Sequence, residues 1–194
     1  MIVSKKYIPQ RWFFFNVFDG QSVLAFKNLS CNVGVIFFNK QMLNQKSFLE
    51  RISPFQEICR KKNQVFLVHF ESNIRGIKGS NGVFIYLKDL KNNFSSIFNK
   101  TTTKKNFFLS TSIHNEKELI SAFANKFDII FISPLSKTRT HPELSAHSPI
   151  NFIKLCYKQK RIVFALGGVT NSNFKRVRNK FLIGFGAISF FLKN

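Results

Sequence analysis

The sequence predicts an α/β fold, namely a compact (β/α)8 TIM barrel that forms a single domain over residues 1–194. Eight short segments are apolar along their whole length, and each is followed by a helical or polar stretch. Continuously apolar strands fit a parallel sheet that is covered on both faces. Regular alternation of strand and helix leaves a doubly wound sheet or a barrel, and eight units favour the barrel.

The first half of the chain supplies four of these strands. A helix is expected over residues 21–29, and a second over residues 47–60, where Pro54 should kink or split it. The segment that follows the fourth strand, up to Lys105, is polar and only weakly helical. The predicted strands span residues 12–18, 33–38, 65–68 and 82–86.

The second half continues the same rhythm. Asn115, with Glu118 three residues later, forms a capping-box pattern and predicts that a helix begins there. Two further helices are expected over residues 150–157 and 171–179. The predicted strands span residues 107–109, 128–132, 161–166 and 181–184.

Three strands of this half are followed by residues that suit an anion. Hydroxyls follow the first in Ser110-Thr111-Ser112, hydroxyls and cations follow the second over residues 133–142, and Gly167-Gly168 follow the third. Backbone N–H groups approach an oxyanion closely where no Cβ intervenes, and a helix N-terminus adds its positive dipole end. The pattern predicts a phosphate site, although the glycines could form only a tight turn, and Ser112 and His114 could merely begin a helix.

The formal net charge of +21 would suit a nucleic-acid or acidic-membrane partner. The basic residues are dispersed, and Lys, Asn, Phe and Ile are abundant together, so we interpret the charge as biased residue usage and do not favour nucleic-acid binding. The 26 phenylalanines lie in apolar runs and are interpreted as core filling.

Three widely spaced cysteines without a CxxC pair argue against a disulfide framework and a zinc site. No apolar run approaches the ~18–20 residues of a membrane span, and the first residues do not resemble a signal peptide. We therefore expect a soluble, cytoplasmic protein with no membrane partner.

Four motifs occur in order at the predicted strand ends of the second half. They are Ser112-Ile113-His114 with Glu116 and Glu118, Ser133-Pro134 to Thr138-Arg139-Thr140-His141, Ala165-Leu166-Gly167-Gly168-Val169, and Ala187-Ile188-Ser189. Together they resemble the thiamine-phosphate synthase / TenI family, whose fold is a compact TIM barrel. The resemblance is best over residues 108–190 and elsewhere rests on the strand–helix rhythm.

The resemblance implies two substrates and a reaction. A thiazole phosphate would place its phosphate at the mouth of the barrel between the loops after strands seven and eight, a usual position in TIM barrels. Its ring nitrogen attacks the methylene carbon of a hydroxymethylpyrimidine pyrophosphate, and pyrophosphate leaves. The implied phosphate- and thiazole-binding residues are Gly167, Gly168, Ile188, Ser189, Thr138 and Thr140. The implied catalytic residues are Ser112, Lys40 and His141.

The first half departs from the family pattern where the pyrophosphate would be held. The family run Gln-Leu-Arg-x-Lys appears as Ile36-Phe37-Phe38-Asn39-Lys40, which keeps only the lysine. The Asn-Asp pair falls at His69-Phe70, unless Glu71 takes its place. The stretch from Gly82 to Asp89 keeps its aspartate but loses its histidine. The resemblance thus implies a Mg²⁺ site at Asp89 that lacks one of two carboxylates, which makes a poor clamp for Mg²⁺.

Three classes of function follow from these observations. The first is nominal thiamine-phosphate synthesis, with a TenI-like thiazole tautomerase as its closest variant. The second is a non-catalytic protein that keeps the barrel and one phosphate pocket. The third, least favoured, is RNA binding driven by the net charge of +21.

Overall fold

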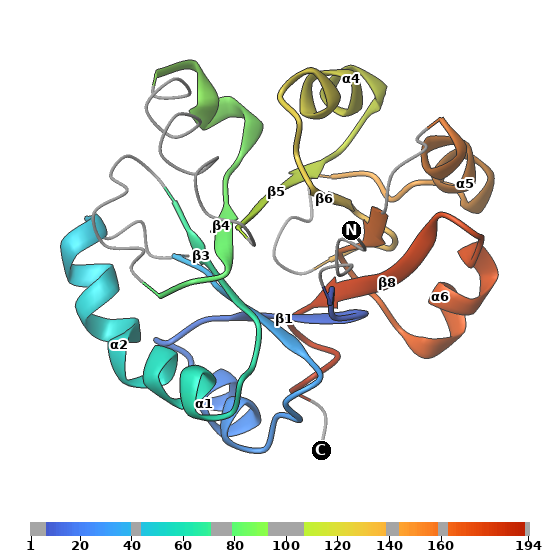
Figure 1. Cartoon of the computed structure of the whole chain (residues 1–194). Helices are drawn as coiled ribbons and strands as arrows, with labels where there is room; N and C mark the ends of the chain where they lie inside the picture. The colour runs from blue at the N-terminus through green and yellow to red at the C-terminus, as the bar shows by residue number, and fades with distance from the viewer. Residues whose placement is uncertain are drawn as a thin grey trace, which may run out of the picture.

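The computed structural model describes residues 7–39, 44–70, 79–92, 107–138, 144–158 and 163–192. Eight parallel strands close into a barrel in sequence order, with β8 pairing to β1 (Figure 1). The predicted (β/α)8 barrel is therefore confirmed. The strands are β1 Arg11–Phe15, β2 Gly34–Phe37, β3 Phe66–His69, β4 Gly82–Phe84, β5 Phe108–Ile113, β6 Ile129–Ile132, β7 Val163–Ala165 and β8 Leu182–Ala187.

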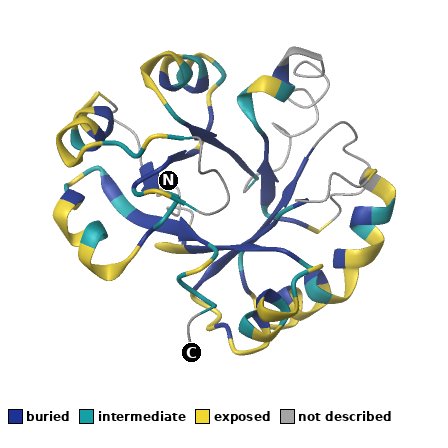
Figure 2. Cartoon of the chain, turned by 180° about the vertical axis from the view of Figure 1, so that it is seen from behind, coloured by how far each residue is buried: buried dark blue, intermediate teal, exposed yellow. Residues whose placement is uncertain are grey.

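The helices surround the barrel, with their exposed faces outward and the strands buried inside (Figure 2). Each described α-helix begins after a residue whose side chain accepts a backbone N–H of the first turn, which is the usual N-cap. These caps are Asp19, Asn44, Asn115, Ser148 and Thr170. The helices are α1 Gly20–Lys27, α2 Gln45–Lys61, α4 Glu116–Ala124, α5 Pro149–Tyr157 and α6 Asn171–Val177, with a 3-10 helix η2 at Leu87–Asn92.

Several strand ends differ from the predicted bounds, and two elements, α2 and β5, differ in a way that their buried side chains explain. Helix α2 is not split at Pro54, because its buried face, including Phe48 and Ile52, outweighs the one backbone hydrogen bond that proline cannot donate; the predicted kink stays a prediction. Strand β5 is longer than expected, so Ser110 and Thr111 are buried strand residues and do not belong to a loop. Ser110 can lie there because its hydroxyl donates to the carbonyl of Val83 at 2.8 Å.

The core has two layers, one between the barrel and the helices and one inside the barrel. The inner layer is aromatic, and Trp12 meets the rings of Phe131 and Phe164 edge to face at 6.4 and 6.3 Å. A Cβ on Gly34 would lie 2.4 Å from the Trp12 ring, so the glycine makes room for the indole. Because these rings fill the inside of the barrel, space for a ligand is left at the ends of the strands.

Candidate functional site

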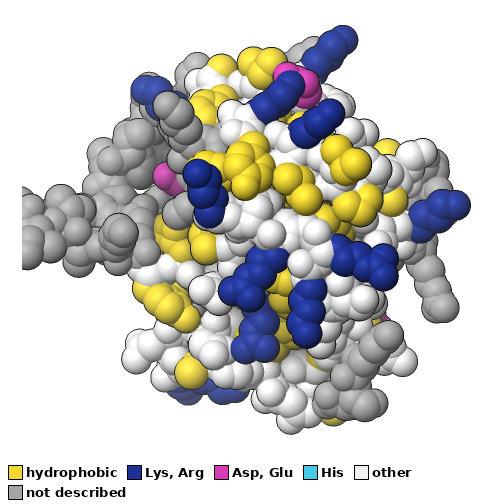
Figure 3. Space-filling view, turned by 90° about the vertical axis from the view of Figure 1, so that its right-hand side faces the viewer, with side chains coloured by type: hydrophobic (Ala, Val, Ile, Leu, Met, Phe, Trp, Pro, Cys, Tyr) yellow, Lys and Arg dark blue, Asp and Glu magenta, His cyan; other side chains and the backbone are white. Residues whose placement is uncertain are grey.

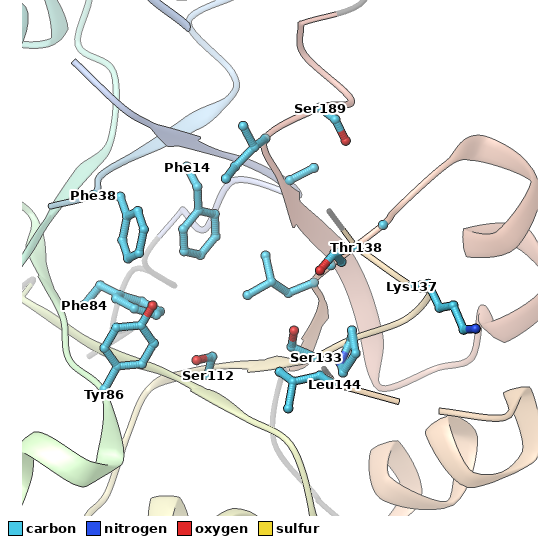
Figure 4. A pocket seen from close by; sticks show the side chains of 16 residues that line it. Phe14, Phe38, Phe84, Tyr86, Ser112, Ser133, Lys137, Thr138, Leu144 and Ser189 are labelled. Atoms are coloured by element: carbon cyan, nitrogen blue, oxygen red, sulfur yellow. The ribbon is translucent and has the colours of Figure 1, made fainter. Parts of the chain in front are cut away.

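A cavity of about 490 Å³ lies at the carboxyl ends of the strands, where TIM barrels carry their active sites. Its volume is in the ordinary range for small-molecule pockets. Residues in or just after β1, β2, β4, β5, β6, β7 and β8 line it. Figure 4 shows aromatic rings on one side of the cavity and most of the hydroxyls on the other.

The turn after β7 is held against the loop after β6. Gly167 and Gly168 have φ of +82° and +61°, a region that side chains other than glycine rarely adopt. A Cβ on Gly168 would also lie 2.8 Å from the carbonyl oxygen of Ser136. Two backbone hydrogen bonds join the turn to the loop: Leu135 N donates to Leu166 O at 2.9 Å, and Ser136 N donates to Gly167 O at 3.1 Å.

These bonds orient the peptide groups of the turn. In a trans peptide the C=O and the following N–H point in opposite directions. Because the carbonyls of Leu166 and Gly167 face the β6 loop, the N–H groups of Gly167 and Gly168 point away from that loop. Asn173 in α6 fixes the next carbonyl by donating from Nδ2 to Gly168 O at 2.8 Å. The turn therefore has a fixed geometry and two backbone donors turned from the β6 loop.

The turn after β8 meets the same cavity. Ala187, Ile188 and Ser189 all line it, and Phe191 N donates to Ile188 O at 3.1 Å to close the turn. Thr138 lines the cavity from the β6 loop. The described residues predicted to bind phosphate and thiazole thus lie together. We call the side formed by Ser133, Thr138, Gly167, Gly168 and Ser189 the polar wall.

Ser112 near the end of β5 lies between the two sides of the cavity, and only 5% of its surface is exposed. The neighbouring His114 has the structural role that its helix-start position suggests. Its backbone N and its Nδ1 contact Glu118 Oε2 at 2.7 and 3.1 Å, at the start of α4. Of the two, Ser112 alone is a cavity residue.

The opposite side of the cavity is formed by Phe14, Phe38, Phe84 and Tyr86, which we call the aromatic wall. Ring-centroid distances are 6.2 Å for Phe14–Phe38, 6.2 Å for Phe38–Tyr86, 5.4 Å for Phe84–Tyr86 and 5.3 Å for Phe14–Phe84. All four contacts are edge to face, the favoured geometry for aromatic pairs. Phe14 and Phe84 belong to the inner layer of the core and Phe38 packs against it, as predicted, and all three also line the cavity.

The aromatic wall carries no charge near neutral pH. His69 packs against Phe38 and Tyr86 at 5.2 and 5.3 Å, and burial, aided by Lys88, lowers its pKa to about 4. Burial, aided by the charge of Asp89, raises the pKa of Tyr86 to about 12. The imidazole is therefore neutral, and the phenol keeps its proton and can donate a hydrogen bond.

Several predicted site residues lie elsewhere. Lys40, Thr140 and His141 fall outside the described residues, so their predicted roles stay predictions. Asp89 lies in η2, where its backbone N donates to Tyr86 O at 3.0 Å, and it is absent from the described cavity lining. No three His, Cys, Asp or Glu side chains among the described residues come together as a metal site. The described residues therefore do not fit Mg²⁺, and we assign no step to a metal.

The described cations lie mainly on the outer surface. Figure 3 shows the side that carries α5 and α6, where Lys and Arg side chains stand among apolar ones; Lys154, Lys175 and Arg176 belong to these helices. Lys137 is the one Lys or Arg in the described cavity lining, and its ammonium points away from the centre of the cavity (Figure 4). Within the described ranges, no helix has the length and apolar character needed to cross a bilayer.

Comparisons with known proteins give a family and a fold. A family model described as thiamine monophosphate synthase matches residues 23–189. Thiamine phosphate pyrophosphorylase from Pyrococcus furiosus is similar at 14% identity over 93% of this chain and 86% of that chain, with a TM-score of 0.68. 2-Keto-3-deoxy-6-phospho-gluconate aldolase from Zymomonas mobilis is similar at 11% identity over 92% of this chain and 81% of that chain, with a TM-score of 0.57. A comparison with curated protein sequences finds no match.

Proposed function

The chain belongs to the thiamine monophosphate synthase family, and on this premise we propose that it binds a thiazole phosphate at the barrel mouth as a cytoplasmic protein of thiamine biosynthesis. The phosphate would lie between the turn after β7 and the turn after β8. The thiazole ring would extend from there into the cavity, toward Thr138 and Ser112.

One observation carries this proposal: the two turns line a single cavity. Gly167 and Gly168 adopt left-handed backbone angles. In turns of this kind, successive backbone N–H groups can point toward one bound anion. Hydroxyls of Thr138 and Ser189 add donors beside them. A phosphate dianion placed there would exchange water for fixed donors at little reorganisation cost.

The nominal reaction would take place over Ser112. The thiazole nitrogen attacks the methylene carbon of the pyrimidine, the carbon–oxygen bond to pyrophosphate breaks, and pyrophosphate leaves with the electron pair. The protein's contribution would be to hold the two rings in line, which alone can supply a large part of a rate enhancement. Lys40 and His141 are proposed as cations for the leaving group, and Thr140 as a second hydroxyl at the thiazole end.

The aromatic wall favours a second candidate, in which the chain binds the thiazole phosphate without coupling it. Phe38 and Phe84 present rings where an anionic leaving group would need cations. This candidate comprises a TenI-like tautomerase and a non-catalytic phosphate-binding protein. Turnover of both substrates to thiamine phosphate would exclude it.

The binding proposal is tested by calorimetric titration of thiazole phosphate. Ser189→Asp places a negative charge in the polar wall, and Ser189→Asn is the matched uncharged control at an exposed position. We expect Ser189→Asp to weaken binding at least about tenfold and Ser189→Asn to change it less than about threefold, because a carboxylate a few ångströms from the phosphate repels it and an amide does not. Equal affinities of the two variants, or no binding by wild type, would reject the proposed phosphate position.

The coupling step is tested separately with Ser112→Ala. If the chain couples the two substrates, this variant should form thiamine phosphate more slowly even when thiazole phosphate is saturating. Normal turnover by Ser112→Ala would remove Ser112 from the mechanism.

A further inference from the structure

We propose that the aromatic wall is a binding subsite for an uncharged planar ring, so that the ligand of this cavity carries a single anionic group, its phosphate, on the polar wall. The inference rests on the proposed function for the position of that phosphate, and it favours the second candidate, in which thiazole phosphate is bound without coupling. It adds the chemical class of the remainder of the ligand and names Phe38 as a residue that determines specificity.

The first argument is the arrangement of the rings. Phe14, Phe38, Tyr86 and Phe84 form a closed circuit of edge-to-face contacts with centroid distances of 5.3 to 6.2 Å. All four also line the cavity, and its accessible surface here comes mainly from Phe38 and Tyr86, because Phe14 and Phe84 are only 4% and 1% exposed. A planar ring that enters can make further stacked or edge-to-face contacts, which add to the affinity beyond the area that the ring buries.

The second argument is electrostatic. The face of an aromatic ring carries a partial negative charge, which repels an anion and attracts a neutral ring edge. An anion placed here would also lose part of its hydration, which opposes its binding. His69 contacts three members of the wall and is 1% exposed, and its neutral imidazole supplies no positive charge in return. Lys88 Nζ lies 5.4 Å from the centroid of the Tyr86 ring, but Lys88 is absent from the described cavity lining. The wall therefore favours an uncharged ring over a phosphate or diphosphate.

The third argument is the set of polar groups at the edge of the wall. The hydroxyl of Tyr86 keeps its proton, and that of Ser112 lies at the base of the cavity between the two walls. Two hydroxyls are enough to orient a heteroaromatic ring through its nitrogen or substituent atoms. A heteroaromatic ring with one or two hydrogen-bonding atoms would contact the aromatic wall, and a phosphate joined to it by a short linker would contact the polar wall.

The test compares two phosphomonoesters by calorimetry, thiazole phosphate with its ring and ethyl phosphate without one. We expect wild type to bind the ring ester at least about tenfold more tightly. Phe38→Leu should reduce that ratio to about threefold or less while leaving ethyl phosphate unchanged. Phe18→Leu is the matched control, because Phe18 is a partly exposed phenylalanine outside the described cavity lining, and it should keep the wild-type ratio.

A second measurement compares an uncharged ring with its diphosphate, in wild type and in Phe38→Arg. With inorganic phosphate saturating the polar wall, uncharged hydroxymethylpyrimidine should bind wild type more tightly than its diphosphate, and Phe38→Arg should reverse that order. Equal binding of the two phosphomonoesters, or tighter binding of the diphosphate by wild type, would overturn the ring subsite and leave the phosphate site standing. If neither phosphomonoester binds, both the subsite and the proposed function are wrong.

Discussion

The two sides of the cavity are built in different ways. The polar wall depends on backbone geometry, with two left-handed glycines tied to the β6 loop and the side chain of Asn173 in α6 donating to the carbonyl of Gly168. The aromatic wall depends on large side chains at the ends of β1, β2 and β4. The first matches the family pattern that the sequence resembles, and the second departs from it.

This difference shows which half of the site can change its chemistry by substitution. A site made of peptide groups is kept as long as the turn folds, because few other residues can adopt its φ values. A site made of side chains changes its charge when one residue is replaced, as at Phe38, where the family pattern has arginine. We infer that the phosphate half tolerates sequence divergence elsewhere in the barrel, while the opposite half sets ligand choice.

The largest expected effect breaks the polar wall. Gly168→Asp adds a carboxylate beside the phosphate position and a Cβ 2.8 Å from Ser136 O at φ +61°. We expect binding of thiazole phosphate to fall at least about a hundredfold, and the free energy of unfolding to fall by about 1–2 kcal/mol or more. Calorimetry and urea unfolding measure the two effects.

Gly20→Asp is the control for this change, because a Cβ at Gly20 meets nothing within 4 Å and a carboxylate suits the first turn of α1. It should leave both quantities within error of wild type. Wild-type binding by Gly168→Asp would show that the turn after β7 does not face the phosphate.

The next largest effect concerns the aromatic wall and pH. The pKa of His69 is lowered from 6.5 to about 4 by burial and by Lys88, so the unfolded chain binds a proton that the folded chain rejects between these values. Stability should therefore be complete above pH 6.5 and fall as the pH drops toward about 4, by about 3 kcal/mol in total. Urea unfolding at a series of pH values measures the slope.

His69→Phe should remove most of that slope, because the ring stays and the proton site goes. A smaller slope should remain, since burial also lowers the pKa of His147. The same pH dependence in wild type and His69→Phe would mean that this imidazole is not held neutral behind the aromatic wall.

The barrel could be predicted from the sequence because the signals for its strands, helix starts and turns are local. Apolar runs, caps such as Asn115, and the Gly167-Gly168 pair lie within a few residues of the features they specify. The aromatic wall could not be predicted in the same way, since Phe14, Phe38 and Phe84 look like every other phenylalanine in an apolar run. Only the barrel register decides which of them face the mouth. The departure from the family pattern at Phe38 and Phe84 was the available signal.

For Ser110 and Thr111 the sequence prediction was wrong. Hydroxyls after an apolar run predicted a loop, yet both are fully buried in β5. Ser110 is accommodated by its bond to Val83 O, a partner on another strand that residue type alone does not reveal. Ser112, two residues further along, reaches the cavity because alternate residues of a strand face opposite sides and Ser110 and Ser112 share one.

The smallest expected effect tests where the two walls meet the ligand. Tyr86→Phe keeps the ring and removes one donor, so binding of thiazole phosphate should weaken by about fivefold, the usual net value of one hydrogen bond. Ethyl phosphate should bind as in wild type, and the free energy of unfolding should stay within about 0.5 kcal/mol. Equal weakening of both esters would place the Tyr86 hydroxyl on the phosphate and abolish the division into two walls. No change for either ester would leave the aromatic wall as a purely apolar surface, with Ser112 as the donor that orients the ring.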